Sequence, residues 1–472
     1  MILYFNLVNV KCIYYNGAII KLRNLYNKVL YSNNERSAKV KKNITLSAIV
    51  IFLSNLNSFL LVPVAIGFVT SLRYGIWLTI LSFINWFNLF DLGLGNGLKN
   101  KLGEAIAKED FKSARELVST AYLSIMAISI LLIIGSIIIF PYISWYKIFN
   151  APKELNNELS RLMQVVFILF AIRFTLQLIN PILAAHQKTA LTQFNNFLSS
   201  TFALLTIFLM TKLINGSLFA LGFAYSIYPV IIYFSVSLYW FLGKFKYIRP
   251  NFHLFKKKHL KSVFNLGIMF LINQIAVVVL STTSNIIISH ISGPEKVTPY
   301  VITQKYFFLI STIFSMMTTP LWPAFTDAYT KRDYNWINRI IKKFNNLWLL
   351  SCLLVFIMLI ISPIFFRLWV GDKVEIPFLL SFLMAFYSIL ISYVNIYSSF
   401  LCGVSKIRLA TLISLIYSVL YIPLAILFSQ TLCLGFYGVI VASIAVITPN
   451  IYNHPTQFKK LIANKATGIW NK

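Results

Sequence analysis

Acidic residues are scarce in this chain, and their scarcity limits the chemistry that it can carry out. Its 472 residues include only 13 Asp and Glu against 42 Lys and Arg. Five of the acids, Glu154, Glu158, Glu295, Asp372 and Glu375, are divided among three short loops. Because glycosyl transfer and polymerisation usually need an acid or base in a sizeable loop, an integral-membrane glycosyltransferase or polysaccharide polymerase stays only an alternative. We predict no enzymatic activity.

Cysteine and histidine are also rare, with four and five residues. The cysteines, at positions 12, 352, 402 and 433, lack metal-ligand spacing, and the histidines are scattered. No Gly-rich phosphate loop, nucleophile elbow or zincin pattern is present. We therefore expect no disulfide framework, no metal site and no cofactor. The net charge of +29 is spread over separate loops, which argues against a nucleic-acid partner.

Long apolar runs are abundant. Hydrophobic residues make up 58% of the chain and charged residues 12%. Stretches of about 20 apolar residues can cross a hydrocarbon core of about 30 Å, so the sequence predicts an all-α polytopic membrane protein. Twelve transmembrane helices are expected, at 44–69, 75–97, 117–145, 160–185, 190–214, 217–242, 260–290, 297–325, 344–367, 377–402, 406–430 and 433–455.

The basic residues indicate the orientation of these spans. If the amino terminus is cytoplasmic, 32 of the 42 Lys and Arg fall on the cytoplasmic face, 8 on the other face and 2 within spans. The positive-inside rule then places both termini in the cytoplasm. The loop 243–259 carries no acid and is expected to face anionic lipid, the alternative being a regulatory or partner-binding patch. Residues 1–43 fit a signal peptide poorly, so we expect an interfacial segment or a start codon placed too early.

A short pattern recurs within the chain at an offset of 223 residues. Segment 104–111 reads EAIAKEDF, and segment 327–334 reads DAYTKRDY. The offset maps the first span onto the seventh. It predicts two six-span lobes, 44–242 and 260–455, joined by the basic linker 243–259 and followed by a basic tail, 456–472. Two parallel lobes are typical of a transporter that rocks around a central site.

Two motifs carry a family resemblance. The run 90–100 reads FDLGLGNGLKN, and the run 320–328 reads PLWPAFTDA. Both resemble the O-antigen flippases of bacterial polysaccharide biosynthesis, within the multidrug/oligosaccharidyl-lipid/polysaccharide (MOP) exporter superfamily. The resemblance implies twelve helices in two pseudo-symmetric lobes around a central cavity. It also implies movement of an undecaprenyl-pyrophosphate-linked glycan across the bacterial inner membrane, beside a polysaccharide polymerase and glycosyltransferases.

Charges inside a bilayer are costly, so two buried cations are candidate site residues. Arg173 lies in the fourth span, and Gln177 and Asn180 follow on the same helical face, which predicts a cavity lining. The alternative is an arginine satisfied by carbonyls or by Asp91. Lys305 lies in the eighth span and either lines the cavity or reaches out to the interface.

The remaining candidates are polar residues and glycines. Gln274 and Asn285 in the seventh span would contact a glycan or join helices by hydrogen bonds. Asp91 precedes Gly93, Gly95 and Gly97, where we expect close packing or a hinge, with the acid capping a helix or pairing with Lys99 or Lys101. This segment would be gating or structural, with proton coupling as the alternative.

The sign of the buried charge distinguishes two transporter types. A cation-coupled multidrug exporter of the same superfamily is expected to bury a carboxylate in its first lobe, but the first span offers only Ser54, Asn55, Asn57 and Ser58. Arginine grips phosphate oxygens bidentately, so Arg173 favours an anionic headgroup. We therefore predict a flippase for a lipid-linked oligosaccharide that works by alternating access, with a multidrug exporter as the alternative. The coupling ion, H⁺ or Na⁺, stays open.

Overall fold

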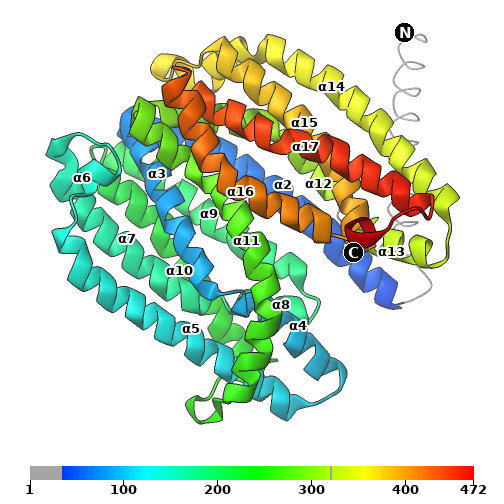
Figure 1. The fold of residues 1–472 in the computed structure, drawn as a ribbon. Helices are drawn as coiled ribbons and strands as arrows, with labels where there is room; N and C mark the ends of the chain where they lie inside the picture. The colour runs from blue at the N-terminus through cyan, green and yellow to red at the C-terminus, as the bar shows by residue number, and fades with distance from the viewer. Residues whose placement is uncertain (1–34, 319–320, 405, 472) are drawn as a thin grey trace, which may run out of the picture.

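The computed structural model describes residues 35–318, 321–404 and 406–471. In these residues the secondary structure is entirely helical (Figure 1). The main helices are α2 (Glu35–Val69), α3 (Ser71–Trp86), α4 (Leu94–Ala107), α5 (Phe111–Ile139), α7 (Asn156–Leu176), α8 (Ile179–Ala185), α9 (Thr189–Leu213), α10 (Leu218–Leu242), α11 (Lys257–Ser292), α12 (Val297–Thr318), α13 (Trp322–Thr330), α14 (Tyr334–Val370), α15 (Phe378–Gly403), α16 (Arg408–Ile426) and α17 (Tyr437–Ile462). The prediction of an all-helical membrane protein is confirmed.

Eight helical segments in the described residues are long and apolar enough to cross a membrane, and the bent pair of α3 and α4 makes a ninth. Each of the twelve predicted spans overlaps at least one helix; α12 and α17 are not among these segments, and part of α11 lies outside the residues that the test covers. Most of residues 1–43 lies outside the described residues, as does Pro320.

Several predicted boundaries differ from the observed ones. Helix α14 begins at Tyr334, ten residues before the predicted span, because a helix continues through its polar, interfacial turns while hydropathy marks only its apolar part. Two described helices, α12 and α13, cover the predicted span 297–325, and residues 319 and 320 between them lie outside the described residues.

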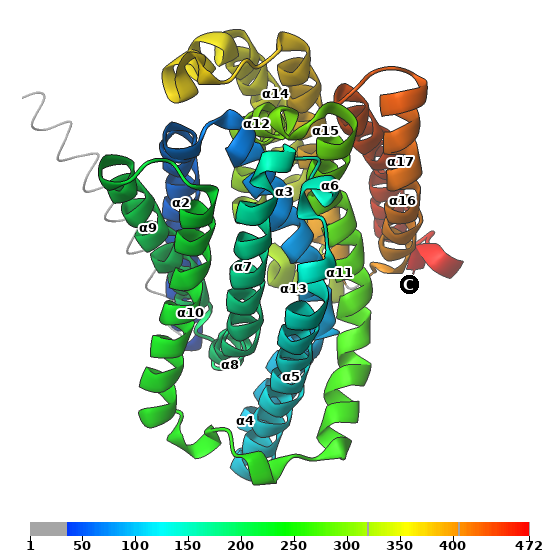
Figure 2. The ribbon, with the colours of Figure 1, turned by 90° about the vertical axis from the view of Figure 1, so that its left-hand side faces the viewer.

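The loops define two ends of the molecule. We call the end with the loops after α4, α10 and α13 the basic end, and the end with the loops before α7 and after α14 the opposite end. Helices α4 and α5 and the loop between α10 and α11 lie together at the bottom of Figure 2. We also call α2–α10 the first series of helices and α11–α17 the second series.

The repeated pattern folds into the same turn twice. Glu109 and Arg332, 223 residues apart, both have a positive φ, at 57° and 59°. Asp110 accepts a hydrogen bond from the N–H of Ser113 at 3.0 Å, and Asp333 accepts one from the N–H of Trp336 at 3.0 Å. Each aspartate thus caps the N-terminus of the next helix, α5 or α14. The hydrogen bonds from Ser113 also lower the pKa of the Asp110 carboxyl.

A second turn recurs at the opposite end with the same offset. Thr70 precedes α3 with φ 85° and ψ 159°, and Gly293 precedes the short helix η6 (Pro294–Lys296) with φ 90° and ψ 153°. These dihedral angles are almost exclusive to glycine. The backbone path is therefore repeated at both ends of the molecule, even where the side chains differ.

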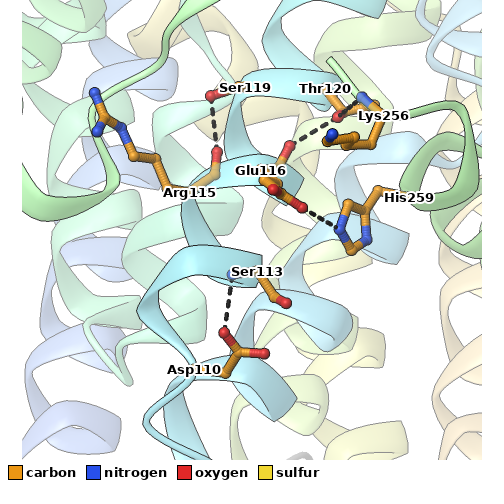
Figure 3. A network of polar contacts seen from close by, with 8 residues as sticks. All are labelled: Asp110, Ser113, Arg115, Glu116, Ser119, Thr120, Lys256 and His259. Carbon is orange, nitrogen blue, oxygen red and sulfur yellow. Dashed lines mark hydrogen bonds and ion pairs between the residues drawn. The ribbon is translucent and has the colours of Figure 1, made fainter. Parts of the chain in front are cut away.

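The linker 243–259 lies along the first turns of α5 at the basic end. The backbone N–H groups of Asn251 and Lys256 donate to the hydroxyls of Ser119 and Thr120 at 3.0 and 3.1 Å. Figure 3 shows the contact between Lys256 and Thr120 and also the 3.0 Å contact between His259 Nε2 and the Glu116 carboxylate. The start of the second series is thereby attached to the first series.

Candidate functional site

Arg173 lines a cavity enclosed by four helices of the first series, α3, α7, α9 and α10. The cavity has a volume of about 360 Å³. Its polar lining includes Arg173, Asn85, Asn196, Ser199, Tyr225 and Tyr233. Tyr233 donates its hydroxyl to the side-chain oxygen of Asn196 at 2.5 Å, which leaves the Asn196 amide group able to donate elsewhere. One cation and several neutral hydrogen-bonding groups therefore face one space.

The Arg173 guanidinium is not neutralised within the described residues. Its Nε atom is buried and has no hydrogen-bond partner there, and its Cζ lies 5.4 Å from the centre of the Phe170 ring. No described Asp or Glu forms an ion pair with it, and the cavity is lined by no acid. An unpaired buried donor is costly, so an anion entering this cavity would be stabilised.

Gln177 and Asn180 line a neighbouring pocket nearer the basic end. This pocket has a volume of about 330 Å³ and also receives Asp91, Gly95, Asn96 and Lys99. Asn196 lines both spaces and so connects them. Gln177 and Asn180 follow Arg173 by four and seven residues, about one and two helical turns, and so line the next pocket along, where α7 ends at Leu176 and α8 begins at Ile179.

The Asp91 segment forms the bend between α3 and α4. Leu92 and Gly93 adopt left-handed conformations, and the two helices differ in direction by 43°. The Asp91 carboxylate accepts a hydrogen bond from the N–H of Gly95 at 3.0 Å and so caps α4. Lys101, one of its two predicted ion-pair partners, pairs with Glu104 instead, at 2.9 Å. A Cβ at Gly97 would lie 2.3 Å from the carbonyl oxygen of Val263, so this glycine permits α11 to approach.

The other three predicted site residues join helices of the two series and line none of the cavities described here. Lys305 Nζ donates to the carbonyl of Ser58 at 3.2 Å. Gln274 donates to the carbonyl of Asn88 at 3.3 Å, and Asn285 donates to the Ser82 hydroxyl at 2.9 Å. These hydrogen bonds place the residues at the boundary between the two series.

Sequence reasoning missed Asn196, Ser199 and Tyr233, which line the Arg173 cavity. The available signal was a pair of adjacent asparagines, Asn195 and Asn196, inside an apolar run. An amide in a membrane helix is expensive unless it faces a partner or a cavity, so this pair could have been included. No group of three His, Cys, Asp or Glu side chains in the described chain is placed to hold a metal ion.

Comparisons with known proteins agree with this architecture. Residues 40–329 match the family model described as polysaccharide biosynthesis protein. The chain belongs to this family. It is 26% identical over 347 residues, 71% of this chain and 76% of the relative, to a "Putative O-antigen export protein" of Yersinia pseudotuberculosis.

Solved structures of MOP-superfamily multidrug transporters share its fold. An inward-facing MATE-family transporter matches with a TM-score of 0.74 and 13% identity, covering 89% of this chain and all of that one. An outward-facing conformation matches with a TM-score of 0.60 and 14% identity, over 90% and 96% of the two chains. The predicted family is thus confirmed, the fold is that of the solved transporters of the predicted superfamily, and the prediction of a non-enzymatic membrane protein agrees with both.

Proposed function

We propose that this protein is a flippase that carries a polyprenyl-pyrophosphate-linked oligosaccharide across the bacterial inner membrane. The observation that carries the proposal is the buried Arg173 guanidinium, which faces a cavity whose described lining includes neutral polar groups and no acid. Pyrophosphate offers the oxygens that a guanidinium binds, while amides and hydroxyls bind sugar hydroxyls. Family membership and the O-antigen export name of the Yersinia relative support this substrate.

The proposed transport cycle uses two six-helix lobes, residues 44–242 and 260–455, with both termini in the cytoplasm. The opposite end is held closed by hydrogen bonds between the series, for example from Thr298 to the Ser71 carbonyl at 2.7 Å and from Asn150 to the Ser289 carbonyl at 2.8 Å. The pocket with Gln177 and Asn180 lies toward the basic end. We therefore assign the structure to the state that loads substrate from the cytoplasm. The higher similarity to the inward-facing transporter supports this assignment.

The test is complementation of a strain that lacks this gene. We expect Arg173→Ala to abolish surface glycan and to accumulate lipid-linked repeat units inside the cell, because losing a charge-assisted contact to phosphate costs about 2 kcal/mol or more. Arg173→Lys should restore part of the export. The matched control is Arg339→Ala, which removes an exposed arginine of α14.

Each competing function has its own outcome. A multidrug exporter would give altered drug resistance with unchanged glycan display in the deletion strain. A polymerase would leave single repeat units on the surface, whereas loss of a flippase leaves none. Full glycan export by Arg173→Ala at normal protein level would refute the role of Arg173.

A further inference from the structure

The second series of helices encloses a pocket of its own. It has a volume of about 270 Å³ and lies between α12, α15, α16 and α17. Its polar and aromatic lining includes Tyr300, Gln304, Phe308, Tyr387, Tyr417 and Asn450.

This pocket is the counterpart of the Arg173 cavity. The 223-residue offset that relates the two repeated turns also relates Leu81 to Gln304 and Asn85 to Phe308, and each member of both pairs lines its own pocket. Further along the chain the offset becomes 218 residues and relates four more pairs of lining residues. These pairs are Arg173 and Ile391, Asn196 and Ser414, Ser199 and Tyr417, and Tyr225 and Ser443. The corresponding helices of each series thus build the two pockets from corresponding positions.

The chemistry of the two pockets differs although their framework is shared. Arg173 is replaced by Ile391, so the second pocket has no cation at that position, and its described lining contains no charged residue. Gln304 adds an amide where the first series has Leu81. The side-chain oxygen of Asn450 is buried and has no hydrogen-bond partner in the described residues. This oxygen needs a donor, and a hydroxyl-bearing ligand supplies one.

We propose that this pocket binds an uncharged sugar ring of the lipid-linked glycan while the Arg173 cavity binds the pyrophosphate. The inference rests on the proposed function. A sugar ring presents hydroxyls to the amides of Gln304 and Asn450, and its apolar C–H face packs on aromatic rings such as Tyr417. Aromatic and aliphatic walls with a few placed polar groups are typical of small-molecule sites. The volume equals that of about nine water molecules at about 30 Å³ each, which suits a single ring.

The experiment measures binding of two probes to the full-length protein in lipid nanodiscs. The first probe is undecaprenyl pyrophosphate without sugar. The second is the undecaprenyl-pyrophosphate-linked repeat unit extracted from cells that lack this gene. Two variants install the residue of the first series at the equivalent position, Gln304→Leu and Tyr417→Ser. The matched control is Gln430→Leu, which changes an exposed glutamine outside the pocket.

We expect the wild-type protein to bind the sugar-bearing probe at least tenfold more tightly than the bare carrier. Gln304→Leu and Tyr417→Ser should each weaken only the sugar-bearing probe, by about three- to tenfold, since each removes a contact made to the sugar. Arg173→Ala should weaken both probes. Gln430→Leu should change neither.

Three results would overturn the proposal, and they separate it from the proposed function. Equal weakening of both probes by the pocket variants would show that the pocket only supports the helices. Unchanged binding of both probes would show that the pocket is not used. Equal wild-type affinity for the two probes, with both weakened by Arg173→Ala, would remove the sugar site and leave the flippase function intact. If the wild-type protein bound neither probe, the proposed function itself would fail.

Discussion

Trp369 holds the opposite end of the molecule closed, and its replacement should shift the protein toward an externally open state. Pro63 interrupts the hydrogen-bond pattern of α2, because it has no N–H to donate to the carbonyl of Phe59. The indole N–H of Trp369 on α14 takes this place and donates to the Phe59 carbonyl at 3.1 Å. The Trp369 ring also stacks on the Phe59 ring, with centroids 4.6 Å apart.

The expected size of the shift toward the externally open state follows from these two contacts. A hydrogen bond of this type contributes about 1 kcal/mol, so Trp369→Phe should raise the externally open population about fivefold. Trp369→Ala also removes the aromatic stacking, which contributes about 1 kcal/mol more, so the population should rise about thirtyfold. Both changes favour opening because the contacts join α2 of the first series to α14 of the second.

The assay follows the labelling of a cysteine in the Arg173 cavity. Asn85→Cys is introduced after all four native cysteines are replaced by serine, and an impermeant maleimide is added outside intact spheroplasts. The labelling rate should rise in proportion to the open population. The matched control is Trp348→Phe, since Trp348 on α14 donates to the carbonyl of Ile389 at 3.0 Å within the second series. Equal labelling rates for Trp369→Phe and Trp348→Phe would refute the reasoning.

Three further predictions concern the framework. Gly97→Val should abolish export and lower the melting temperature, because the Cβ atom of the valine would overlap the Val263 carbonyl. The control is Gly103→Val, which should leave export normal because the space around Gly103 is open. Thr70→Gly should stabilise the protein by about 1 kcal/mol in thermal unfolding, since it relieves a conformation that only glycine adopts easily; a lower melting temperature would contradict this. Asp333→Ala should destabilise the protein by about 1 kcal/mol through the lost helix cap, and Asp333→Asn should retain most of the stability.

The sequence predicted the helices well because long apolar runs have few other solutions in a membrane. Helix ends were less predictable, since α14 extends ten residues beyond its apolar part and hydropathy does not register those turns. The repeat was predicted from eight residues, whereas the second pair of matching turns, at Thr70 and Gly293, has no sequence signal.

The candidate site was only partly predictable. Arg173 was identified because a charge in a membrane span is rare, and the structure places it in a cavity. Helical periodicity predicted Gln177 and Asn180 on the same face as Arg173, but they lie about one and two turns further along and line the neighbouring pocket. For Lys305, the sequence predicted a position either in the cavity or at the membrane interface. Its actual hydrogen-bond partner is the carbonyl of Ser58, 247 residues away in the chain. Contacts between residues so far apart in the chain depend on how the two series of helices pack together, which a single sequence does not reveal.

The linker that fastens α11 to α5 has a mechanical consequence. Four hydrogen bonds join the linker and His259 to about one and a half turns of α5, one of them donated by Arg115 of α5 to the Arg249 carbonyl of the linker. Opening at the opposite end therefore cannot separate the two series as free bodies. The two series must instead rotate about this attachment. Helix α11 would then transmit the movement from one face of the membrane to the other.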